Sequence, residues 1–359
     1  MNTTDDIVIV GGGPAGAYCA LELSKKGFYP TIFDHSHPRE KPCGGGISPL
    51  VIKKFPFLEK FRSTGCTFGN FKIISCTDFQ VFTKELENGY CISRRYFDQG
   101  ILDMATENGS KLIKEKVIMI QKKGRIWKIK TNKRVFSSQM IVGADGVNSC
   151  VRTKIVGPIA VENLGLTFGY LTKSLEKITP VIKFLAEMPG YIWVFPGHDY
   201  TNIGIGSELK YGNILKKRVD SFIRSNYPKI KLVSKYAAMI PSATDPKFFK
   251  FPCAGKNWIL IGDAAGHVDP IGGGGILYAL WGGKLAADAI KNSDPKSFDF
   301  MWRKEYGKNL EKRCKNKDAY YDPVESTIAF MRGLAKKTYF IDNRNRGHLK
   351  KSEDLTLPK

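Results

Sequence analysis

Apolar residues at the start of the chain follow the pattern of a strand, a helix and a second strand. Residues 6–10 form a short run of mostly β-branched residues that stops at a glycine, as buried parallel strands do. From 15 to 26 the apolar spacing becomes helical and ends at Gly27, and residues 29–34 are typical of another strand. This order predicts a βαβ unit with a right-handed crossover.

The middle of the chain carries the looser alternation of antiparallel strands. Residues 66–92 alternate in this way, and two or three strands joined by turn residues are expected within 117–142. The further predicted strands are 164–171, 180–187, 191–195, 201–206 and 258–261. The helices predicted by apolar spacing are 95–108, 214–226 and 276–290. The residues after 295 are predicted to be helical and are rich in lysine.

The size and composition of the chain agree with two domains around buried cores. Its 359 residues exceed what one hydrophobic core usually supports, and 42% apolar and 25% charged residues are ordinary for a globular protein. The N-terminus lacks the basic and apolar regions of a signal peptide, and the apolar region 258–290 is interrupted by charged residues. We therefore expect a cytoplasmic protein that is not integral to a membrane.

Cysteine spacing and net charge limit which metal sites, disulfides and binding partners are expected. The eight cysteines include no C-x-x-C pair, and no histidine lies at ligand spacing, so we expect neither metal nor disulfides. The formal charge of +22 favours phosphate-bearing partners such as an anionic membrane surface, and a lysine-rich solvated surface explains it equally well. Because no basic block alternates with aromatic residues, no specific nucleic acid is expected.

A glycine motif joins the first strand to the first helix. Residues 11–16 read Gly-Gly-Gly-Pro-Ala-Gly and contain G-x-G-x-x-G, in which the first glycine makes the turn, the second admits a pyrophosphate and the third lets the helix pack on the strand. Asp34 ends the second strand about 20 residues further on, where a carboxylate accepts hydrogen bonds from ribose hydroxyls. The predicted dinucleotide site contains Gly11, Gly13, Pro14, Ala15, Gly16 and Asp34.

Two more motifs follow at predicted strand ends. Ala144-Asp145-Gly146 closes one strand, and Gly262-Asp263-Ala-Ala-Gly266 closes another, with Pro270 and glycines 272–275 ahead of a helix. In this order and at these distances, the three motifs resemble the FAD-binding framework of the aromatic-hydroxylase-like flavoproteins. The resemblance implies an α/β fold of the p-hydroxybenzoate-hydroxylase type. Such a fold has a Rossmann-like FAD-binding domain, an interleaved antiparallel β-sheet substrate domain and, here, a short helical C-terminal region.

The resemblance also implies how the chain divides and which residues hold FAD. The implied segments are 1–65, 93–158 and 255–292 for the FAD-binding domain, 66–92 and 159–254 for the substrate domain, and 293–359 for the C-terminal region. Asp263 is expected to bind the ribityl chain, and the backbone after Pro270 to lie against the isoalloxazine, where the following helix stabilises negative charge near N1. Arg94, at an R-x-x-F-D position, is expected to contact the cofactor, unless it is a surface residue and Arg95 takes that role. The other implied cofactor contacts are Asp145, Gly262, Gly273, Gly274, Gly275 and Ile276.

Two further stretches resemble the geranylgeranyl reductase family, which reduces isoprenoid double bonds in archaeal diether lipids, the chlorophyll side chain and some quinones. Residues 42–46, Pro-Cys-Gly-Gly-Gly, are similar to its C-G-G/E-G loop, and residues 189–196, Pro-Gly-Tyr-Ile-Trp-Val-Phe-Pro, to its P-x-Y-x-W-x-F-P strand. The resemblance implies that Cys43, Gly44 and Gly45 lie near the flavin. The implied isoprenoid-binding residues are Gly45, Tyr191, Trp193, Phe195 and Pro196.

The reaction that the resemblance implies is transfer of hydride from reduced flavin N5 to an isoprenoid alkene, with a proton added from another group. The candidate catalytic residues are Cys43, Tyr191 and Trp193. Cys43 is either a reactive thiol or a small filler beside glycines that let the loop move. Tyr191, Trp193 and Phe195 share one strand face, which forms either an aromatic wall for a prenyl chain or an ordinary sheet core. His267 is expected to make a local hydrogen bond.

Departures from the family pattern leave alternatives open. Asp34 stands where the family more often has glutamate, and the region after 291 is shorter than in many relatives, so the length and head group of the lipid stay open. With a single G-x-G-x-x-G, we expect electrons from transiently bound NADPH or from ferredoxin. The alternatives are a flavin-dependent monooxygenase or halogenase, whose W-x-W-x-I-P strand is similar to 191–196, and a non-catalytic flavin protein on a membrane or RNA surface. The favoured hypothesis is a cytoplasmic, peripherally membrane-associated FAD enzyme that acts on isoprenoid lipids.

Overall fold

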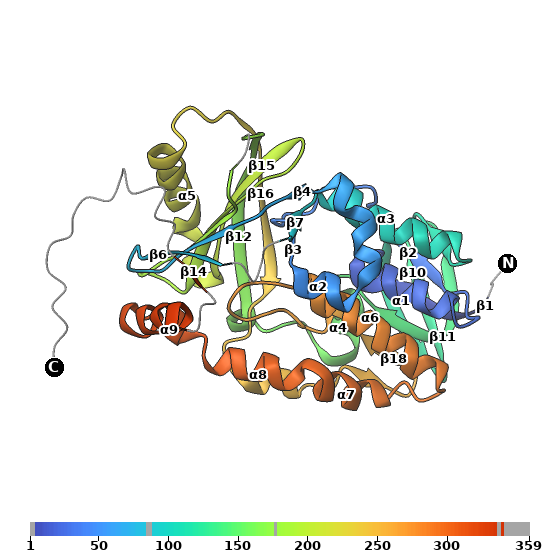
Figure 1. Ribbon diagram of the computed structural model, residues 1–359. Coiled ribbons are helices and arrows are strands. Elements are labelled where there is room, and N and C mark those ends of the chain that lie inside the picture. The colour runs from blue at the N-terminus through green and yellow to red at the C-terminus, as the bar shows by residue number, and fades with distance from the viewer. Residues whose placement is uncertain (1–3, 84–87, 176–177, 336–338, 341–359) are drawn as a thin grey trace, which may run out of the picture.

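The computed structural model describes residues 4–83, 88–175, 178–335 and 339–340, and two large sheets dominate it (Figure 1). The first sheet has the strand order β17-β18-β11-β1-β2-β8, and a hairpin of β9 and β10 extends from β11. Its strands are β1 (Thr4–Val10), β2 (Thr31–Phe33), β8 (Lys111–Ile113), β9 (Val117–Lys123), β10 (Ile126–Thr131), β11 (Val135–Gly143), β17 (Ala254–Gly255) and β18 (Trp258–Leu260).

The core of the first sheet is parallel because its strands are apolar enough to be buried on both faces. β18, β11, β1, β2 and β8 pair in parallel, and Val8 and Ile9 of β1 have no exposed surface. Val10 lies beside Phe33 of β2 and Gly143 of β11. The carboxyl ends of these strands therefore meet at one edge of the sheet, where the three glycine and aspartate motifs follow.

Three helices form a layer against this sheet. They are α1 (Pro14–Ser24), α3 (Arg94–Glu107) and α6 (Ile276–Lys291). α1 packs against both α3 and α6, and all of its residues are buried. Its apolar character on every side thus has a structural reason, because the sheet and two helices surround it.

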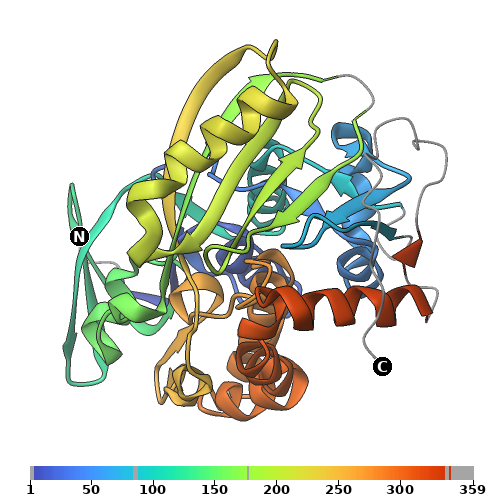
Figure 2. The ribbon, with the colours of Figure 1, turned by 90° about the vertical axis from the view of Figure 1, so that its left-hand side faces the viewer.

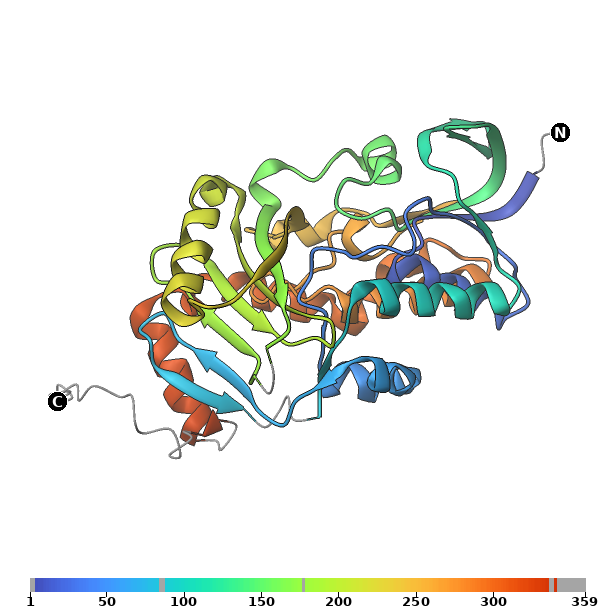
Figure 3. The same ribbon diagram turned by 90° about the horizontal axis from the view of Figure 1, so that it is seen from above.

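The second sheet has the order β16-β12-β15-β14-β13-β5-β6-β19 and is mostly antiparallel (Figure 3). Its strands are β5 (Phe71–Ile74), β6 (Gln80–Thr83), β12 (Leu164–Lys173), β13 (Val181–Phe184), β14 (Gly190–Phe195), β15 (Tyr200–Glu208), β16 (Leu232–Pro241) and β19 (Tyr339–Phe340). On one face, Ile192 and Val194 of β14 share a core with Leu215 and Val219 of α5 (Gly212–Asn226). The alternating residues of β14 therefore point to the opposite face.

A small sheet and short helices complete the described chain. The small sheet consists of β3 (Gly46–Ile47), β4 (Cys66–Thr67) and β7 (Tyr90–Cys91). The remaining α-helices are α2 (Pro49–Lys54), α4 (Cys150–Val156), α7 (Ser297–Trp302), α8 (Lys308–Lys315) and α9 (Pro323–Ala335). α7, α8 and α9 lie along the lower edge of the molecule in both Figure 1 and Figure 2. The predicted fold class, a Rossmann-like sheet combined with an antiparallel sheet, is confirmed.

Within the described ranges, none of the helices has both the length and the apolar character that crossing a bilayer requires. The same residues contain no group of three or more His, Cys, Asp or Glu side chains that could hold a metal ion.

Candidate active site

The first glycine motif forms a tight turn between β1 and α1. Gly11 has a φ of +101°, and a Cβ at this position would lie 2.3 Å from the carbonyl oxygen of Ala144. A Cβ at Gly16 would lie 1.9 Å from the carbonyl oxygen of Gly11. Both glycines are therefore required for the strand, the helix and the Ala144 turn to approach one another.

Gly13 differs because the space beside it is open. A Cβ at Gly13 would meet no protein atom within 4 Å, although its φ of −67° suits any residue. The N-terminus of α1, which begins at Pro14 and Ala15, receives no side-chain cap from the part of the chain described here. Uncapped N–H groups at a helix N-terminus bind phosphate. The turn therefore fits the pyrophosphate of FAD.

Asp34, directly after β2, is an ionised acceptor beside this turn. Its Oδ2 accepts a hydrogen bond from the N–H of Gly12 at 2.7 Å, and its Oδ1 accepts from the N–H and the hydroxyl of Ser36, both at 2.7 Å. Burial raises the pKa of Asp34, but the neighbouring His37 imidazole and the hydrogen bonds from Ser36 outweigh burial and lower it. Oδ2 keeps a lone pair for a ribose hydroxyl, so the carboxylate fits the adenosine half of FAD.

His37 lies between two carboxylates behind this site. Its Nδ1 is 3.1 Å from Oδ1 of Asp34, and its Nε2 is 3.7 Å from Oδ2 of Asp98. Burial lowers the pKa of His37, but the two carboxylates outweigh burial and raise it. The protonated imidazole therefore contributes to the stability of the folded state.

We expect His37→Gln to destabilise the protein mainly at acidic pH. A raised folded-state pKa means that the contribution of His37 is fully present below the unfolded pKa of about 6.5 and is lost as pH rises through the folded-state pKa. Urea denaturation should give a loss of about 2 kcal/mol near pH 5 and a smaller loss near pH 9. A loss of the same size at both pH values would contradict this role.

Arg94, the first residue of α3, is buried. Its Nε donates to Oδ1 of Asp98 at 2.6 Å and its Nη2 to Oδ2 at 2.8 Å. Burial lowers the pKa of Arg94, but Asp98 and then Cys43 outweigh burial and raise it. The guanidinium thus lies beside the Cys43 loop, while Arg95 is exposed. Contact between Arg94 and the cofactor stays a prediction.

Two charged residues just before Cys43, Glu40 and Lys41, hold its loop in place through contacts with distant segments. Glu40 accepts a hydrogen bond from the N–H of Arg94 at 2.9 Å, at the start of α3. The Nζ of Lys41 lies 3.2 Å from Oδ2 of Asp263. The loop is thereby connected to the carboxylate expected at the ribityl chain, and neither contact was predicted from the sequence.

The glycines of this loop are required because other parts of the chain pack directly on them. A Cβ at Gly44 would lie 2.3 Å from the ring of Phe195. Gly45 has a φ of +70°, and a Cβ there would lie 2.1 Å from the carbonyl oxygen of Ile92. The N–H of Gly45 also donates to Sγ of Cys43 at 3.4 Å. These contacts favour close packing of the loop against β14 over free movement.

Asn202 on β15 connects the loop to the aromatic strand. Its Nδ2 donates to the carbonyl oxygen of Cys43 at 3.0 Å. Its Oδ1 accepts from Nε1 of Trp193 at 2.8 Å and from the hydroxyl of Tyr236 at 2.6 Å. Because Asn202 is only 2% exposed, these three bonds are made without competition from water. No motif in the sequence pointed to Asn202 or Tyr236.

The aromatic strand also contacts the glycine run ahead of α6. The hydroxyl of Tyr191 donates to the carbonyl oxygen of Gly272 at 2.6 Å, and burial raises the pKa of Tyr191, so it stays protonated. A Cβ at Gly273, which has a φ of +65°, would lie 2.6 Å from that hydroxyl. α6 begins at Ile276 with Gly275 before it, and no side chain of the described residues caps it. An uncapped helix N-terminus fits the anionic N1 side of a reduced flavin.

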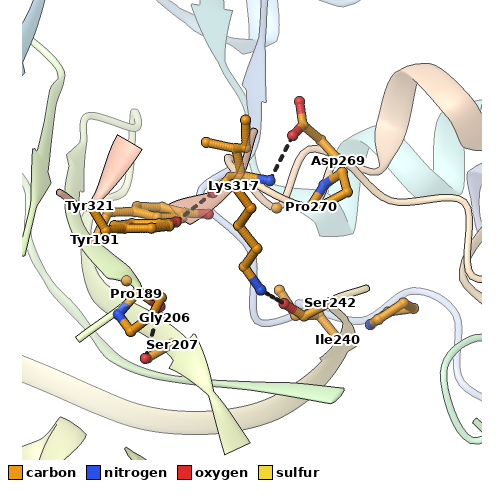
Figure 4. Close-up of a pocket in the computed structure, with 14 residues that line it drawn as sticks. Pro189, Tyr191, Gly206, Ser207, Ile240, Ser242, Asp269, Pro270, Lys317 and Tyr321 are labelled. Atoms are coloured by element: carbon orange, nitrogen blue, oxygen red, sulfur yellow. Dashed lines mark hydrogen bonds between the residues drawn. The ribbon is translucent and has the colours of Figure 1, made fainter. Parts of the chain in front are cut away.

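A small cavity lies behind Tyr191 and Pro270 (Figure 4). Its volume of about 30 Å³ leaves room for one water molecule. Lys317, which is 4% exposed, points into this region, and its Nζ lies 3.2 Å from both Oε1 of Glu208 and Oγ of Ser242. A cavity of this size, lined by the Lys317 ammonium, does not suit a prenyl chain.

The second motif shapes the turn next to Gly11. The carboxylate of Asp145 accepts hydrogen bonds from the hydroxyl of Ser149 and from the N–H of Cys150, the latter at 2.8 Å. Burial raises the pKa of Asp145. A Cβ at Gly11 would lie 2.9 Å from the Cα of Asp145, so the backbone of this motif supports the dinucleotide turn.

The remaining predicted residues lie around the same edge of the sheet. Gly262 has a φ of +59°, and a Cβ there would lie 2.9 Å from the side chain of Ala15. The carbonyl oxygen of Gly274 accepts from the N–H of Asp269 at 3.1 Å, which closes the glycine run. Pro196 directly follows β14 and is buried. Gly262 and the glycine run therefore follow β18 of the parallel sheet, whereas Pro196 follows β14 of the second sheet.

His267 is buried outside this site. Its Nδ1 lies 2.9 Å from the hydroxyl of Tyr306, which is 39 positions further along the chain, so this contact is not the local one expected from the sequence. Burial lowers the pKa of His267 to about 3. The imidazole is therefore neutral at ordinary pH and is no proton source for the site.

The chain is similar to known proteins over most of its length. Residues 9–51 match the family model described as an NAD(P)-binding Rossmann-like domain. The digeranylgeranylglycerophospholipid reductase of Methanospirillum hungatei is 27% identical, over 89% of this chain and 86% of that protein. The geranylgeranyl diphosphate reductase of Rhodobacter capsulatus is 28% identical, over 88% of this chain and 84% of that protein.

A solved structure shares the fold over most of its length. It is that of a geranylgeranyl bacteriochlorophyll reductase-like protein from Thermoplasma acidophilum, with a TM-score of 0.78, 22% identity, and coverage of 91% of this chain and 90% of that chain. The fold and these relatives fit the class of FAD-dependent oxidoreductases. Within that class, the resemblance of the chain to the geranylgeranyl reductases is confirmed.

Proposed function

We propose that this protein is an FAD-dependent reductase that saturates carbon–carbon double bonds of geranylgeranyl-type chains in membrane lipids or related polyprenyl compounds. The observation that carries the proposal is the contact between the two motifs typical of geranylgeranyl reductases. Gly44 packs on the ring of Phe195, and Tyr191 of the same strand donates to Gly272 of the glycine run. The Cys43 loop, the aromatic strand and the expected flavin position therefore adjoin one another.

The reaction adds a hydride to one alkene carbon and a proton to the other. Reduced FAD, when bound, supplies the hydride. The chain offers two groups for the proton, the thiol of Cys43 and the protonated hydroxyl of Tyr191. Trp193, held by Asn202, and Phe195 provide the apolar surface that orients the prenyl chain and keeps water away.

The residues proposed to hold FAD fall into groups, each of which contacts a different part of the cofactor. The turn at Gly13 takes the pyrophosphate, and Asp34 takes the adenosine ribose. Asp263, with Lys41 beside it, takes the ribityl chain. The backbone of Gly273 to Ile276 takes the flavin ring, with Gly44 and Gly45 on the other side.

The other proposed partners are an electron donor and a membrane surface. Electrons come from NADPH bound transiently or from a ferredoxin, because the chain has a single dinucleotide motif. The lipid substrate and the charge of +22 support peripheral association of a cytoplasmic protein with an anionic membrane.

A halogenase or monooxygenase is the second candidate function. A flavin-dependent brominase shares the fold with a TM-score of 0.69 at 19% identity. What favours the reductase is the glycine loop packed on Phe195, a loop that the halogenase pattern does not include. The non-catalytic alternative lacks a comparable structural argument.

The test is an anaerobic product assay. FAD-loaded protein is reduced with dithionite and incubated with a geranylgeranylated phospholipid, geranylgeranyl diphosphate or menaquinone. The masses of the products are then measured by mass spectrometry. We expect a gain of hydrogen pairs on at least one substrate without oxygen. Product that forms only with air, or only with air and halide, would favour the second candidate.

A further inference from the structure

The last described helix carries an exposed apolar stripe. Ser326 and Phe330 of α9 are buried, and the hydroxyl of Ser326 lies 3.0 Å from Sγ of Cys76 in the second sheet domain. Val324, Ile328 and Met331 are 66%, 36% and 54% exposed. Their spacing of four and three residues places them on the helix face opposite the buried one.

The preceding helix, α8, carries a stripe of exposed lysines. α8 buries Leu310 and Cys314 and exposes Lys308, Lys312 and Lys315, again at spacings of four and three. None of these lysines forms an ion pair with any residue in the described ranges. Basic residues of α8 outnumber acidic ones by four to one.

The segment that contains both helices contacts the loop ahead of α6, where Nε of Arg313 on α8 lies 2.7 Å from Oδ2 of Asp269. α8 and α9 lie along one edge of the molecule in two perpendicular views (Figures 1 and 2). Tyr321, two residues before α9, lines the same cavity as Tyr191 and donates to the carbonyl oxygen of Ile271 at 3.0 Å (Figure 4). Tyr321 thus connects the start of α9 to the residues just before the glycine run.

We propose that α8 and α9 form the surface that docks on an anionic lipid bilayer. The apolar stripe enters the interfacial region, and the lysine stripe lies against lipid phosphates. This inference rests on the proposed function, because a polyprenyl lipid leaves a bilayer at a large cost in free energy, so its enzyme must work at the surface.

The charge and side-chain types of this surface favour an anionic bilayer over a second copy of the protein or RNA as its partner. The chain carries +22, and the lysine stripe matches an anionic surface, whereas a second copy of the same face would bring like charges together. RNA would use aromatic side chains for base stacking, and the exposed stripe of α9 is aliphatic. An anionic membrane can contact both stripes, because its interfacial region accepts the apolar side chains and its phosphates attract the lysines.

The test is flotation of FAD-loaded protein with vesicles of phosphatidylcholine, with and without phosphatidylglycerol. We expect the wild-type protein to float with the anionic vesicles and to be released by salt. Lys308→Gln, Lys312→Gln and Lys315→Gln combined should weaken binding on the order of 100-fold. Val324→Ser, Ile328→Ser and Met331→Ser combined should weaken it at least about tenfold.

Matched controls lie on the β9–β10 hairpin and in the turn that follows β10, at the opposite end of the molecule from α9 (Figure 1). Ile118→Ser with Met119→Ser, and Lys123→Gln with Lys130→Gln and Lys133→Gln, change exposed residues of the same kinds. We expect these variants to bind as the wild type does. Equal weakening by the controls, or no anionic preference in the wild type, would overturn the proposal.

Two further readouts separate this proposal from the others. Turnover of detergent-dispersed substrate should stay unchanged in the Val324, Ile328 and Met331 variant, so lost docking with retained turnover supports the surface assignment. If no substrate is reduced at all, flotation still tests the surface, and the proposed function alone fails. A wild-type dimer that the serine variant dissociates, or RNA that displaces the vesicles, would assign the face to another partner.

Discussion

Replacing Gly13 with valine is expected to lower the affinity for FAD on the order of 100-fold while the apoprotein stays folded. In the structure a Cβ at Gly13 would meet no protein atom within 4 Å, so the substitution clashes with nothing in the protein itself. It would fill the space in front of the uncapped N-terminus of α1, where two or more charge-assisted hydrogen bonds to pyrophosphate are expected. Apoprotein stability should change by less than about 1 kcal/mol.

Two other glycines make this prediction specific. Gly69→Val adds the same side chain at an exposed glycine with equally open space, and should leave FAD affinity unchanged. Gly16→Ala should instead destabilise the fold by about 2 kcal/mol or more, because its Cβ would lie 1.9 Å from the carbonyl oxygen of Gly11. The measurements are FAD titration of the apoprotein and urea denaturation. Wild-type affinity in Gly13→Val would mean that the cofactor does not approach this turn.

Removing the side chain of Asn202 is expected to weaken the fold and the reaction together. Asn202→Ala leaves the indole N–H of Trp193 and the carbonyl oxygen of Cys43 without their buried partners, and it also removes the acceptor of the Tyr236 hydroxyl. Three such bonds are together worth about 3 kcal/mol. Because the loop and the aromatic strand lose their common support, turnover should fall about 100-fold, while FAD affinity changes little.

The neighbouring residue on β15 provides the control. Thr201 is also buried, but its side chain points to the opposite face and accepts one hydrogen bond, from the N–H of Leu175 at 3.0 Å. Thr201→Val should cost about 1 kcal/mol and leave turnover per folded molecule unchanged. If Asn202→Ala lost stability but kept wild-type turnover, Asn202 would be a structural residue and not a positioning one.

The N-terminal βαβ unit could be predicted because its apolar residues are strongly periodic and Gly11 and Gly16 stand where only glycine fits. β1, α1 and the turn at Gly11 follow from an apolar β-branched run, a helical run and residues that require positive φ or close approach. β16 was missed because it is an edge strand whose residues from Leu232 to Lys235 are exposed, so no alternating burial pattern marks it. Edge position depends on the partner strands, which local pattern does not reveal.

The polar contacts that support the site could not be predicted from the sequence, because they too depend on distant segments. Lys41 and Asn202 are single polar residues, and their roles depend on segments more than 150 positions away, Asp263 for the first and Cys43 for the second. Resemblance identified Arg94, but not that its guanidinium is paired with Asp98. Residues in motifs could therefore be proposed from the sequence, whereas the polar contacts that hold their segments together could not.

The central claim is that reduced flavin in this protein gives its electrons to an isoprenoid double bond. The most direct measurement is anaerobic stopped-flow absorbance of dithionite-reduced, FAD-loaded protein mixed with a geranylgeranylated phospholipid in detergent. The proposed function predicts that oxidised flavin absorbance returns in proportion to substrate, with one pair of hydrogens gained by the lipid per flavin oxidised. Flavin that stays reduced with every polyprenyl substrate, and reoxidises only when oxygen enters, would contradict it.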